Sequence, residues 1–314
     1  MRRTHCIVVV LVSLGTICSA QTVTETFGSG ANAFTMDFVT IGNPGNAADT
    51  SGNPNPAGSV AYTYNLGKYE VSRDQIDKAN AAGSLGITMY DMSSFEGNGA
   101  NKPATVLNWY GAAKYVNWLN TSTGGTAAYK FDSIGNFQLW SAGDAGYNAN
   151  NMFRNSLAKY VIASSNEWYK GAYGNRDGTW NDYATGSDSE PTAVAGGTDA
   201  NTAVYGGQAG PADINNAGGL SPYGTMGQGG NVWEWTETAS DGSNNIAGES
   251  RWLLGGSWNN GGYLFFLQAA NRFYADPSSE FYGGGFRVAS VPEPSSLSLL
   301  ALGGVLALFR RKRA

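Results

Sequence analysis

The residues best suited to chemistry in this sequence lie in one short string. Gly230-Asn231-Val232-Trp233-Glu234-Trp235 places a carboxylate between two tryptophans, directly after paired glycines. Glu234 and the neighbouring backbone carbonyls are oxygen ligands of the kind that Ca²⁺ prefers, and the ion takes about six to eight of them. The alternative interpretation is a strand edge with two core tryptophans and a solvated glutamate. The string therefore predicts either an oxygen-built cation site or an ordinary strand.

Imidazole and thiol chemistry are excluded from most of the chain. The sequence has one histidine, His5, and two cysteines, Cys6 and Cys18. All three lie in residues 1–20, which have the layout of a removable leader. Without that leader the protein has no histidine base, cysteine nucleophile, disulfide, haem, iron–sulfur cluster or ordinary zinc site. Any metal that it binds must then be held by oxygen ligands.

Residues 1–20 read as a secretory signal peptide. Arg2 and Arg3 precede an apolar run that starts at Ile7, and the small residues Ser19-Ala20 stand before Gln21. This order of basic, apolar and small residues is typical of export signals that signal peptidase removes. The alternative, a buried first strand, explains neither the two arginines nor the small-residue stop.

Residues 291–314 have the features of a second targeting signal. Val291-Pro292-Glu293-Pro294 precedes an uncharged, mostly apolar stretch over 295–309 and a basic tail over 310–313. Fifteen helical residues span about 22 Å, less than the ~30 Å hydrocarbon core, so a permanent transmembrane helix is marginal. The basic tail would stay on the cytoplasmic side. A plain C-terminal anchor is the alternative.

This C-terminal segment resembles the PEP-CTERM sorting signal of Gram-negative bacteria. The resemblance implies export, transient anchoring in the inner membrane by the short helix, and removal of the tail by an exosortase-type enzyme. The final location would be the cell surface or the extracellular matrix.

The body of the chain is acidic and rich in glycine. Of 314 residues 44 are glycine and 14% are charged, so the composition predicts a loop-rich globular protein. Without Arg2, Arg3, Glu293 and the basic tail, 13 Lys and Arg face 23 Asp and Glu, a net charge of −10. Because phosphate backbones repel such a surface, we expect no nucleic-acid partner.

Local patterns predict few regular elements. A strand region over Ala33–Ile41 precedes a turn-rich loop over 43–58, and we assign 21–59 to an N-terminal strand and loop region. Capping residues predict three helices: from Ser72 to Gly83, from Asn108 through Leu119, and from Ser164 to Gly174.

Residues 175–230 lose all periodicity. An irregular segment of this length needs contacts that hold it in place. Because disulfides are excluded, we expect bound cations or aromatic packing to provide them. Late strands are predicted at Val232–Thr236, Trp252–Leu254 and Phe286–Val288.

Several strings occur in an order that carries a resemblance over about residues 60–290. After the string around Glu234 come Leu254-Gly255-Gly256-Ser257-Trp258, Asn271-Arg272 and Gly285-Phe286-Arg287-Val288-Ala289. Together with the earlier segments 66–72, 103–119 and 164–168, they resemble the formylglycine-generating enzyme (sulfatase-modifying factor) domain. The resemblance implies an α+β, C-type-lectin-like fold with few helices and short strands, held partly by calcium.

The family's calcium ligands can be carried over position by position. One site falls on Asn201 and Thr202, although Asn201 is equally well explained as a turn residue. The second falls on Gly230, Val232 and Glu234, but a further ligand position is Gly227, which has no side chain. We therefore expect structural calcium, with a weaker second site.

The family's copper-binding cysteine pair has no counterpart. Its positions fall on Asn260 and at or next to Phe265, and an amide and a phenyl ring neither bind copper(I) well nor exchange with a thiol. Copper is therefore not expected, nor is the histidine-bound iron of the related sulfoxide-forming enzymes.

The same cleft predicts a binding site. The residues expected to line it are Ser257, Trp258, Asn259, Asn260, Tyr263 and Arg272. Aromatic faces with amide and guanidinium groups suit a peptide or a polysaccharide. We expect a surface binding module without catalytic residues. The alternatives are a formylglycine-type or other oxidase in the same cleft, and a matrix filler with no specific ligand.

Overall fold

The computed structural model describes residues 21–53 and 55–292. The signal peptide and the apolar stretch with its basic tail lie outside the described residues. Within the described part, no helix combines the length and apolar character needed to cross a membrane.

Three α-helices form where the capping residues predict them. They are α1 (Arg73–Gly83), α2 (Trp109–Ser122) and α3 (Ser165–Tyr173). Ser72 and Ser164 each form a full capping box, and the Asn108 side chain accepts a hydrogen bond from Gly111 N at 2.9 Å. These contacts satisfy N–H groups that have no partner inside the helix. The three predicted helix starts are confirmed.

The first sheet has five strands in the order β1-β2-β3-β13-β6, all antiparallel. The strands are β1 (Thr22–Phe27), β2 (Phe34–Ile41), β3 (Tyr64–Gly67), β6 (Tyr160–Ile162) and β13 (Val288–Ser290). The region 21–59 therefore supplies two strands to the same sheet as the later segments, rather than standing beside them.

The second sheet has four strands in the order β11-β10-β9-β12. They are β9 (Trp233–Ala239), β10 (Arg251–Leu254), β11 (Phe273–Ala275) and β12 (Gly284–Phe286). The single strand expected over Phe286–Val288 is wrong. The chain leaves the second sheet at Phe286 and enters the first at Val288, so Arg287 lies at the junction of the two sheets.

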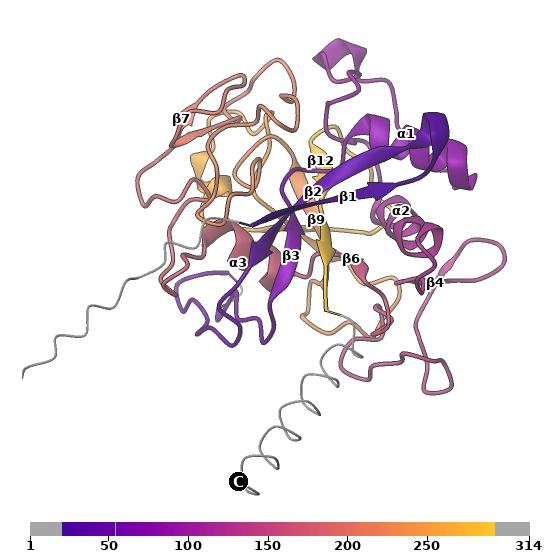
Figure 1. Cartoon of the computed structure of the whole chain (residues 1–314). Helices are drawn as coiled ribbons and strands as arrows, with labels where there is room; N and C mark the ends of the chain where they lie inside the picture. The colour runs from indigo at the N-terminus through magenta and orange to yellow at the C-terminus, as the bar shows by residue number, and fades with distance from the viewer. Residues whose placement is uncertain (1–20, 54, 293–314) are drawn as a thin grey trace, which may run out of the picture.

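Short elements complete the fold. The two-stranded pairs are β4 (Lys130–Phe131) with β5 (Phe137–Gln138), and β7 (Thr192–Ala193) with β8 (Thr202–Ala203). The short helices are η1 (Gly30–Asn32), η2 (Ser93–Phe95) and η3 (Leu264–Leu267). Figure 1 shows α1 and α2 on one side of the central strands, with α3 and the irregular β7 region on the other.

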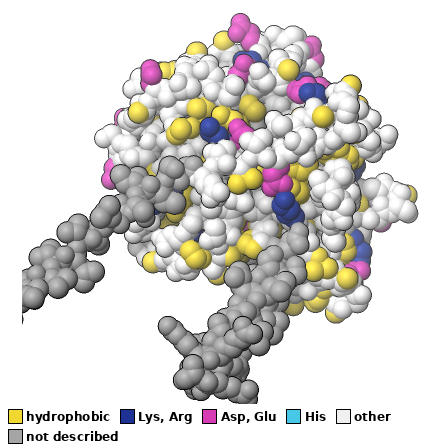
Figure 2. Space-filling model, in the orientation of Figure 1, with side chains coloured by type: hydrophobic (Ala, Val, Ile, Leu, Met, Phe, Trp, Pro, Cys, Tyr) yellow, Lys and Arg dark blue, Asp and Glu magenta, His cyan; other side chains and the backbone are white. Residues whose placement is uncertain are grey.

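Buried aromatic side chains fill the interior between these layers. Trp109, Trp168 and Trp235 are fully buried, and the main core continues from the β1–β2 hairpin to α3. On the face shown in Figure 2, charged side chains are sparse and stand singly or in small groups among polar and apolar ones. The loop-rich globular character expected from composition is confirmed.

The irregular stretch 175–230 is held by a small core of its own and by backbone hydrogen bonds. That core contains Met92, Val106, Val204, Ala212, Ala217, Met226, Val232 and Trp258. Asn231 Oδ1 accepts from Ala212 N at 2.8 Å. Gly230 has a φ of +96°, and a Cβ there would lie 2.5 Å from Val204 O, so only glycine fits.

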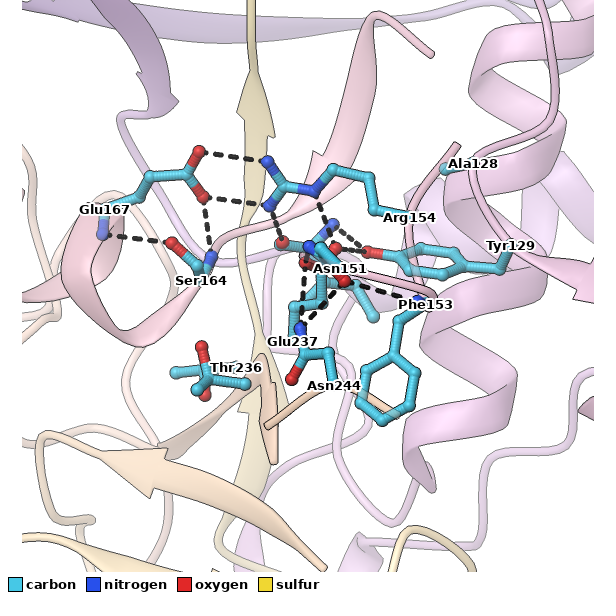
Figure 3. A network of polar contacts seen from close by, with 12 residues as sticks. Ala128, Tyr129, Asn151, Phe153, Arg154, Ser164, Glu167, Thr236, Glu237 and Asn244 are labelled. Atoms are coloured by element: carbon cyan, nitrogen blue, oxygen red, sulfur yellow. Dashed lines mark hydrogen bonds and ion pairs between the residues drawn. The ribbon is translucent and has the colours of Figure 1, made fainter. Parts of the chain in front are cut away.

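A buried ionic network connects the start of α3 to β9. Arg154 lies between Glu167 and Glu237, with N···O distances of 3.0 and 2.8 Å (Figure 3). Tyr129 Oη donates to Glu237 at 2.8 Å, and Tyr62 Oη donates to Glu167 at 2.5 Å. One guanidinium thus faces two carboxylates, and hydroxyl donors supply the rest of the stabilisation that water would give.

Because of this network, we expect the free energy of unfolding to decrease at acidic pH. Burial raises the pKa of Glu167, but Arg154 and Tyr62 outweigh it and hold the value at about 2, below the ordinary 4.5. A lowered folded-state pKa adds stability above the unfolded-state value, and this is lost as the pH falls from about 4.5 to about 2. We expect Glu167→Gln to remove about 3 kcal/mol of that pH dependence.

Urea unfolding followed by tryptophan fluorescence between pH 2 and 7 measures the effect. The exposed Glu96→Gln serves as control and should leave the profile unchanged. Parallel profiles for wild type and Glu167→Gln would contradict the prediction.

Candidate functional site

Glu234 lies on β9 in the interior and is fully buried. Arg287 binds it in a two-point contact, with Nη2–Oε1 at 2.5 Å and Nε–Oε2 at 2.6 Å. Trp168 Nε1 from α3 also donates to Oε2 at 2.6 Å. Glu234 is therefore neither solvated, as the strand-edge interpretation expects, nor free of protein partners.

Arg287 uses its remaining donors on backbone carbonyls. Nη1 donates to Gly67 O at 2.9 Å, and Nη2 donates to Met226 O at 2.9 Å. Its guanidinium thus connects β3, β9 and the end of the irregular stretch. The geometry suits arginine, because a planar fork of donors matches a carboxylate and several carbonyls together.

A second buried carboxylate, Glu70, lies beside this pair. Asn231 Nδ2 donates to Glu70 Oε2 at 2.7 Å, whereas Oε1 has no hydrogen-bond partner within residues 21–53 and 55–292. Burial, followed by the nearby charge of Glu234, raises the pKa of Glu70 well above its ordinary value. A Cβ at Gly227 would lie 3.0 Å from Glu70 Oε2, so the Glu70 carboxylate occupies the space where a side chain at 227 would begin.

The two side chains expected to bind calcium, those of Asn201 and Glu234, already have hydrogen-bond partners inside the protein. Asn201 Oδ1 accepts from Thr185 Oγ1 at 2.8 Å, and Thr202 O accepts from Gly219 N at 2.9 Å. At the second site both oxygens of the Glu234 carboxylate accept hydrogen bonds from Arg287, and Oε2 also accepts one from Trp168 Nε1. The described residues contain no group of three or more His, Cys, Asp or Glu placed to hold a metal. A calcium ion would have to displace these contacts, so calcium stays a prediction.

Ser257, Asn259 and Asn260 form one tight turn after β10. Ser257 Oγ has one proton and two acceptors within reach, Asn259 Oδ1 at 2.6 Å and Asn260 Oδ1 at 2.9 Å. Ser257 N also donates to Asn260 Oδ1 at 2.5 Å. Ser257 is fully buried and Asn259 is exposed. The amide of Asn260 thus closes this turn.

Trp258 points into the interior instead of lining an open cleft. Its side chain is 4% exposed and packs in the small core of the irregular stretch. Its ring centroid lies 5.2 Å from that of Phe95, which in turn lies 5.0 Å from that of the exposed Tyr282. Its expected role as a direct ligand contact therefore conflicts with its burial.

Tyr263 belongs to a different group, a row of aromatic side chains that reaches solvent. We name this group the aromatic surface: Trp252, Tyr263, Phe265, Phe266, Phe273 and Tyr274. Successive ring centroids lie 4.1 to 6.2 Å apart, with the buried Trp233 bridging Phe266 and Phe273. Four of its members are 44 to 59% exposed.

Arg272 joins the aromatic surface at its other end. Its guanidinium carbon lies 3.3 Å from the ring centroid of Trp252 on β10. Tyr274, two residues further on, is the cross-strand partner of Trp252. The structure thus brings Ser257, Asn259 and Asn260 together, but it places Trp258 in a buried core and Arg272 beside Trp252.

Sequence reasoning missed Glu70, Trp252, Phe273 and Tyr274. Phe273 and Tyr274 directly follow Arg272, and their type was the available signal: aromatic residues on a three-residue strand at a sheet edge. The sequence around Glu70 gives no such indication, because no local pattern predicts its hydrogen bond with Asn231.

A cavity of about 450 Å³ lies away from all these residues. It is bounded by the start of α2 and the turn between β4 and β5, where Asn108, Tyr110, Lys114 and Asn136 line it. None of the residues that the sequence predicts for the binding site lines this cavity.

The buried pair should dominate stability. Arg287→Met leaves Glu234 charged and unpaired in the interior, which costs about 3 to 5 kcal/mol. Arg287→Lys should fall between wild type and Met, because lysine cannot reproduce the two-point contact. The control is Lys78→Met in the partly exposed pair with Asp74, where about 0.5 kcal/mol or less is expected. Urea unfolding of the three variants measures the differences, and equal losses for Arg287→Met and Lys78→Met would contradict this ranking.

Comparisons with known proteins agree with this architecture. The sulfatase-modifying factor enzyme 1-like domain matches residues 28–291, and the PEP-CTERM protein-sorting motif matches residues 290–313. No curated protein matches the chain.

Solved structures share the fold. Treponema denticola variable protein 1 is 20% identical, with a TM-score of 0.59 over 86% of this chain and 99% of that one. CarF is 19% identical, with a TM-score of 0.58 over 82% and 98%. PvdO from Pseudomonas aeruginosa is 18% identical, with a TM-score of 0.52 over 85% and 98%. With the family match over residues 28–291, the chain belongs to the sulfatase-modifying factor enzyme 1-like, or formylglycine-generating enzyme, family and carries a PEP-CTERM motif for export and surface sorting.

Proposed function

We propose that this exported protein is a binding module of the cell surface or extracellular matrix, which takes a peptide or a saccharide on its aromatic surface. The observation that carries the proposal is the exposure of that surface. Tyr263 and Tyr274 are 59% and 56% exposed, and Phe273 is 49% exposed. Contiguous apolar side chains that face solvent mark interaction sites, because a monomer gains stability from burying them.

The chemistry of the surface suits ligands with both apolar and polar faces. Aromatic rings offer broad contact area with few rotatable bonds, so little entropy is lost when a ligand packs on them. Asn259 is exposed at the neighbouring turn, and Arg272 adds a guanidinium. Pyranose rings and extended peptides both present the C–H groups and hydrogen-bonding atoms that such a mixture recognises.

The oxidase alternative has no observation in its favour. Asn260 Oδ1 accepts hydrogen bonds from Ser257, and Phe265 packs on Phe266 with ring centroids 4.1 Å apart. Neither position offers a thiolate for copper or for exchange with a substrate cysteine. Mass spectrometry of a sulfatase-type cysteine peptide incubated with the protein and copper tests this directly, and a formylglycine product would overturn the proposal.

Processing by an exosortase-type enzyme follows from the sorting motif, which matches residues 290–313. The body that remains after both ends are removed spans about the range of the family match. We propose that this body, presented outside the inner membrane, is the form that binds ligand.

Calcium is a separate proposal that rests on the family resemblance. A ligand that binds only the folded state adds stability by mass action, so EDTA should lower the thermal unfolding midpoint by several degrees and added Ca²⁺ should restore it. Differential scanning fluorimetry with Mg²⁺ as the control ion measures this. An unchanged midpoint in EDTA would remove calcium and leave Arg287 as the cation that compensates Glu234.

Binding on the aromatic surface predicts a local effect of substitution. We expect Phe273→Ser with Tyr274→Ser to weaken binding of any ligand found on glycan and peptide arrays at least tenfold, because both rings lose contact area. The matched control is Tyr90→Ser, an equally exposed tyrosine outside the aromatic surface. Biolayer interferometry measures both variants, and equal affinities for the double variant and wild type would contradict the proposal.

A further inference from the structure

Arg272 differs from the other arginines of the described chain in having no hydrogen-bonding partner there. Each of the other five has a glutamate or a main-chain carbonyl as partner: Arg73, Arg154, Arg176, Arg251 and Arg287. The contact of Arg272 within residues 21–53 and 55–292 is the stack on Trp252. A guanidinium has five N–H donors, and the four on the two terminal nitrogens of Arg272 are left for a ligand.

The stack fixes how those donors are presented. Nε is shielded from solvent and unpartnered, whereas the terminal nitrogens are not among the buried unpartnered atoms and remain reachable. With its guanidinium carbon 3.3 Å from the centroid of the Trp252 ring, the group is held against that ring while its terminal nitrogens stay accessible. Such an orientation costs little further entropy when a ligand arrives.

No protein carboxylate competes for this group. No described Asp or Glu lies within ion-pair distance of Arg272, and burial alone lowers its pKa, to about 10. The side chain is therefore still charged at neutral pH. A partly desolvated, unpaired cation favours an anionic group that supplies the missing hydrogen bonds.

The surroundings restrict the chemistry of that anion. Tyr274 lies opposite Trp252 with ring centroids 5.6 Å apart, and Phe273 stacks beside it at 6.2 Å. A ligand that reaches Arg272 thus also covers exposed rings, whose faces pack against the C–H groups of a pyranose. An added peptide strand would gain little here, because the edge strand β11 has three residues and few main-chain groups to pair.

We propose that Arg272 makes the aromatic surface selective for a carboxylate-bearing saccharide, a uronate, over the corresponding neutral sugar. This inference rests on the proposed function. The carboxylate accepts two parallel N–H groups of the guanidinium, and the sugar ring packs on Tyr274 and Phe273. Recognition is local, because the net charge of −10 repels long polyanions at low salt and is screened beyond about 8 Å at physiological salt.

The test uses pairs of ligands that differ only in the carboxylate. Oligogalacturonate and oligomannuronate are each compared with their methyl esters by isothermal titration calorimetry at physiological salt, using the processed protein. We expect wild type to bind at least one acid form tenfold or more tightly than its ester. We expect Arg272→Gln to bind the acid and the ester with equal affinity, and Arg272→Lys to keep part of the preference for the acid.

The control variant is Arg176→Gln, which removes one exposed positive charge elsewhere and should leave the preference intact. Thermal unfolding verifies that the Arg272 variants are folded. Equal affinity for acid and ester overturns the inference and leaves the proposed function standing, as does an acid preference that survives in Arg272→Gln. Binding of an aspartate-rich peptide with neither uronate bound overturns it in favour of a peptide ligand. Absence of any ligand on the glycan and peptide arrays overturns the proposed function as well.

Discussion

The contact between Glu234 and Arg287 is the constraint on which the rest of the structure depends. Arg287 stands where the chain leaves one sheet and enters the other, and its donors reach β3, β9 and the backbone at Met226. A buried ion pair stabilises a fold only when its remaining donors and acceptors are satisfied. Here they are, because Trp168 and three carbonyls complete the set. The pair therefore connects β3 of the first sheet to β9 of the second.

Glu70 shows how little spare space this arrangement leaves. It adds a second carboxylate near one guanidinium, and burial, followed by the charge of Glu234, raises the pKa of Glu70. Gly227 must lack a side chain, since a Cβ would press on the Glu70 carboxylate. An exported protein without cysteines in its body thus obtains its cross-connections from buried ions and from glycines that permit close approach. The network of Arg154 with Glu167 and Glu237 follows the same plan between α3 and β9.

The parts of the fold that depend on neighbours in sequence were predictable. Ser72, Asn108 and Ser164 place helix starts, because a cap acts within three residues. The break at Arg287 was not predictable, since the residues around it read as one continuous strand. Its cause is a partner 53 residues away, Glu234, and no local pattern reports such a pairing. The same holds for Glu70 and Asn231, which are 161 residues apart.

The same distinction, between what local sequence predicts and what packing decides, applies to the binding site. Residue type and family resemblance pointed to Ser257, Tyr263 and Arg272, but only the packing decides which of them meet. Trp258 follows Ser257 directly and yet turns inward, because the adjacent irregular stretch needs an apolar side chain to close its core. The interior is held by buried ion pairs, whereas the edge strand β11 and the turn after Ser257 carry the exposed side chains Phe273, Tyr274 and Asn259. A scaffold of this kind can change its ligand through changes of surface residues alone. On the aromatic surface, the unpaired Arg272 adds selection by charge to binding by aromatic contact.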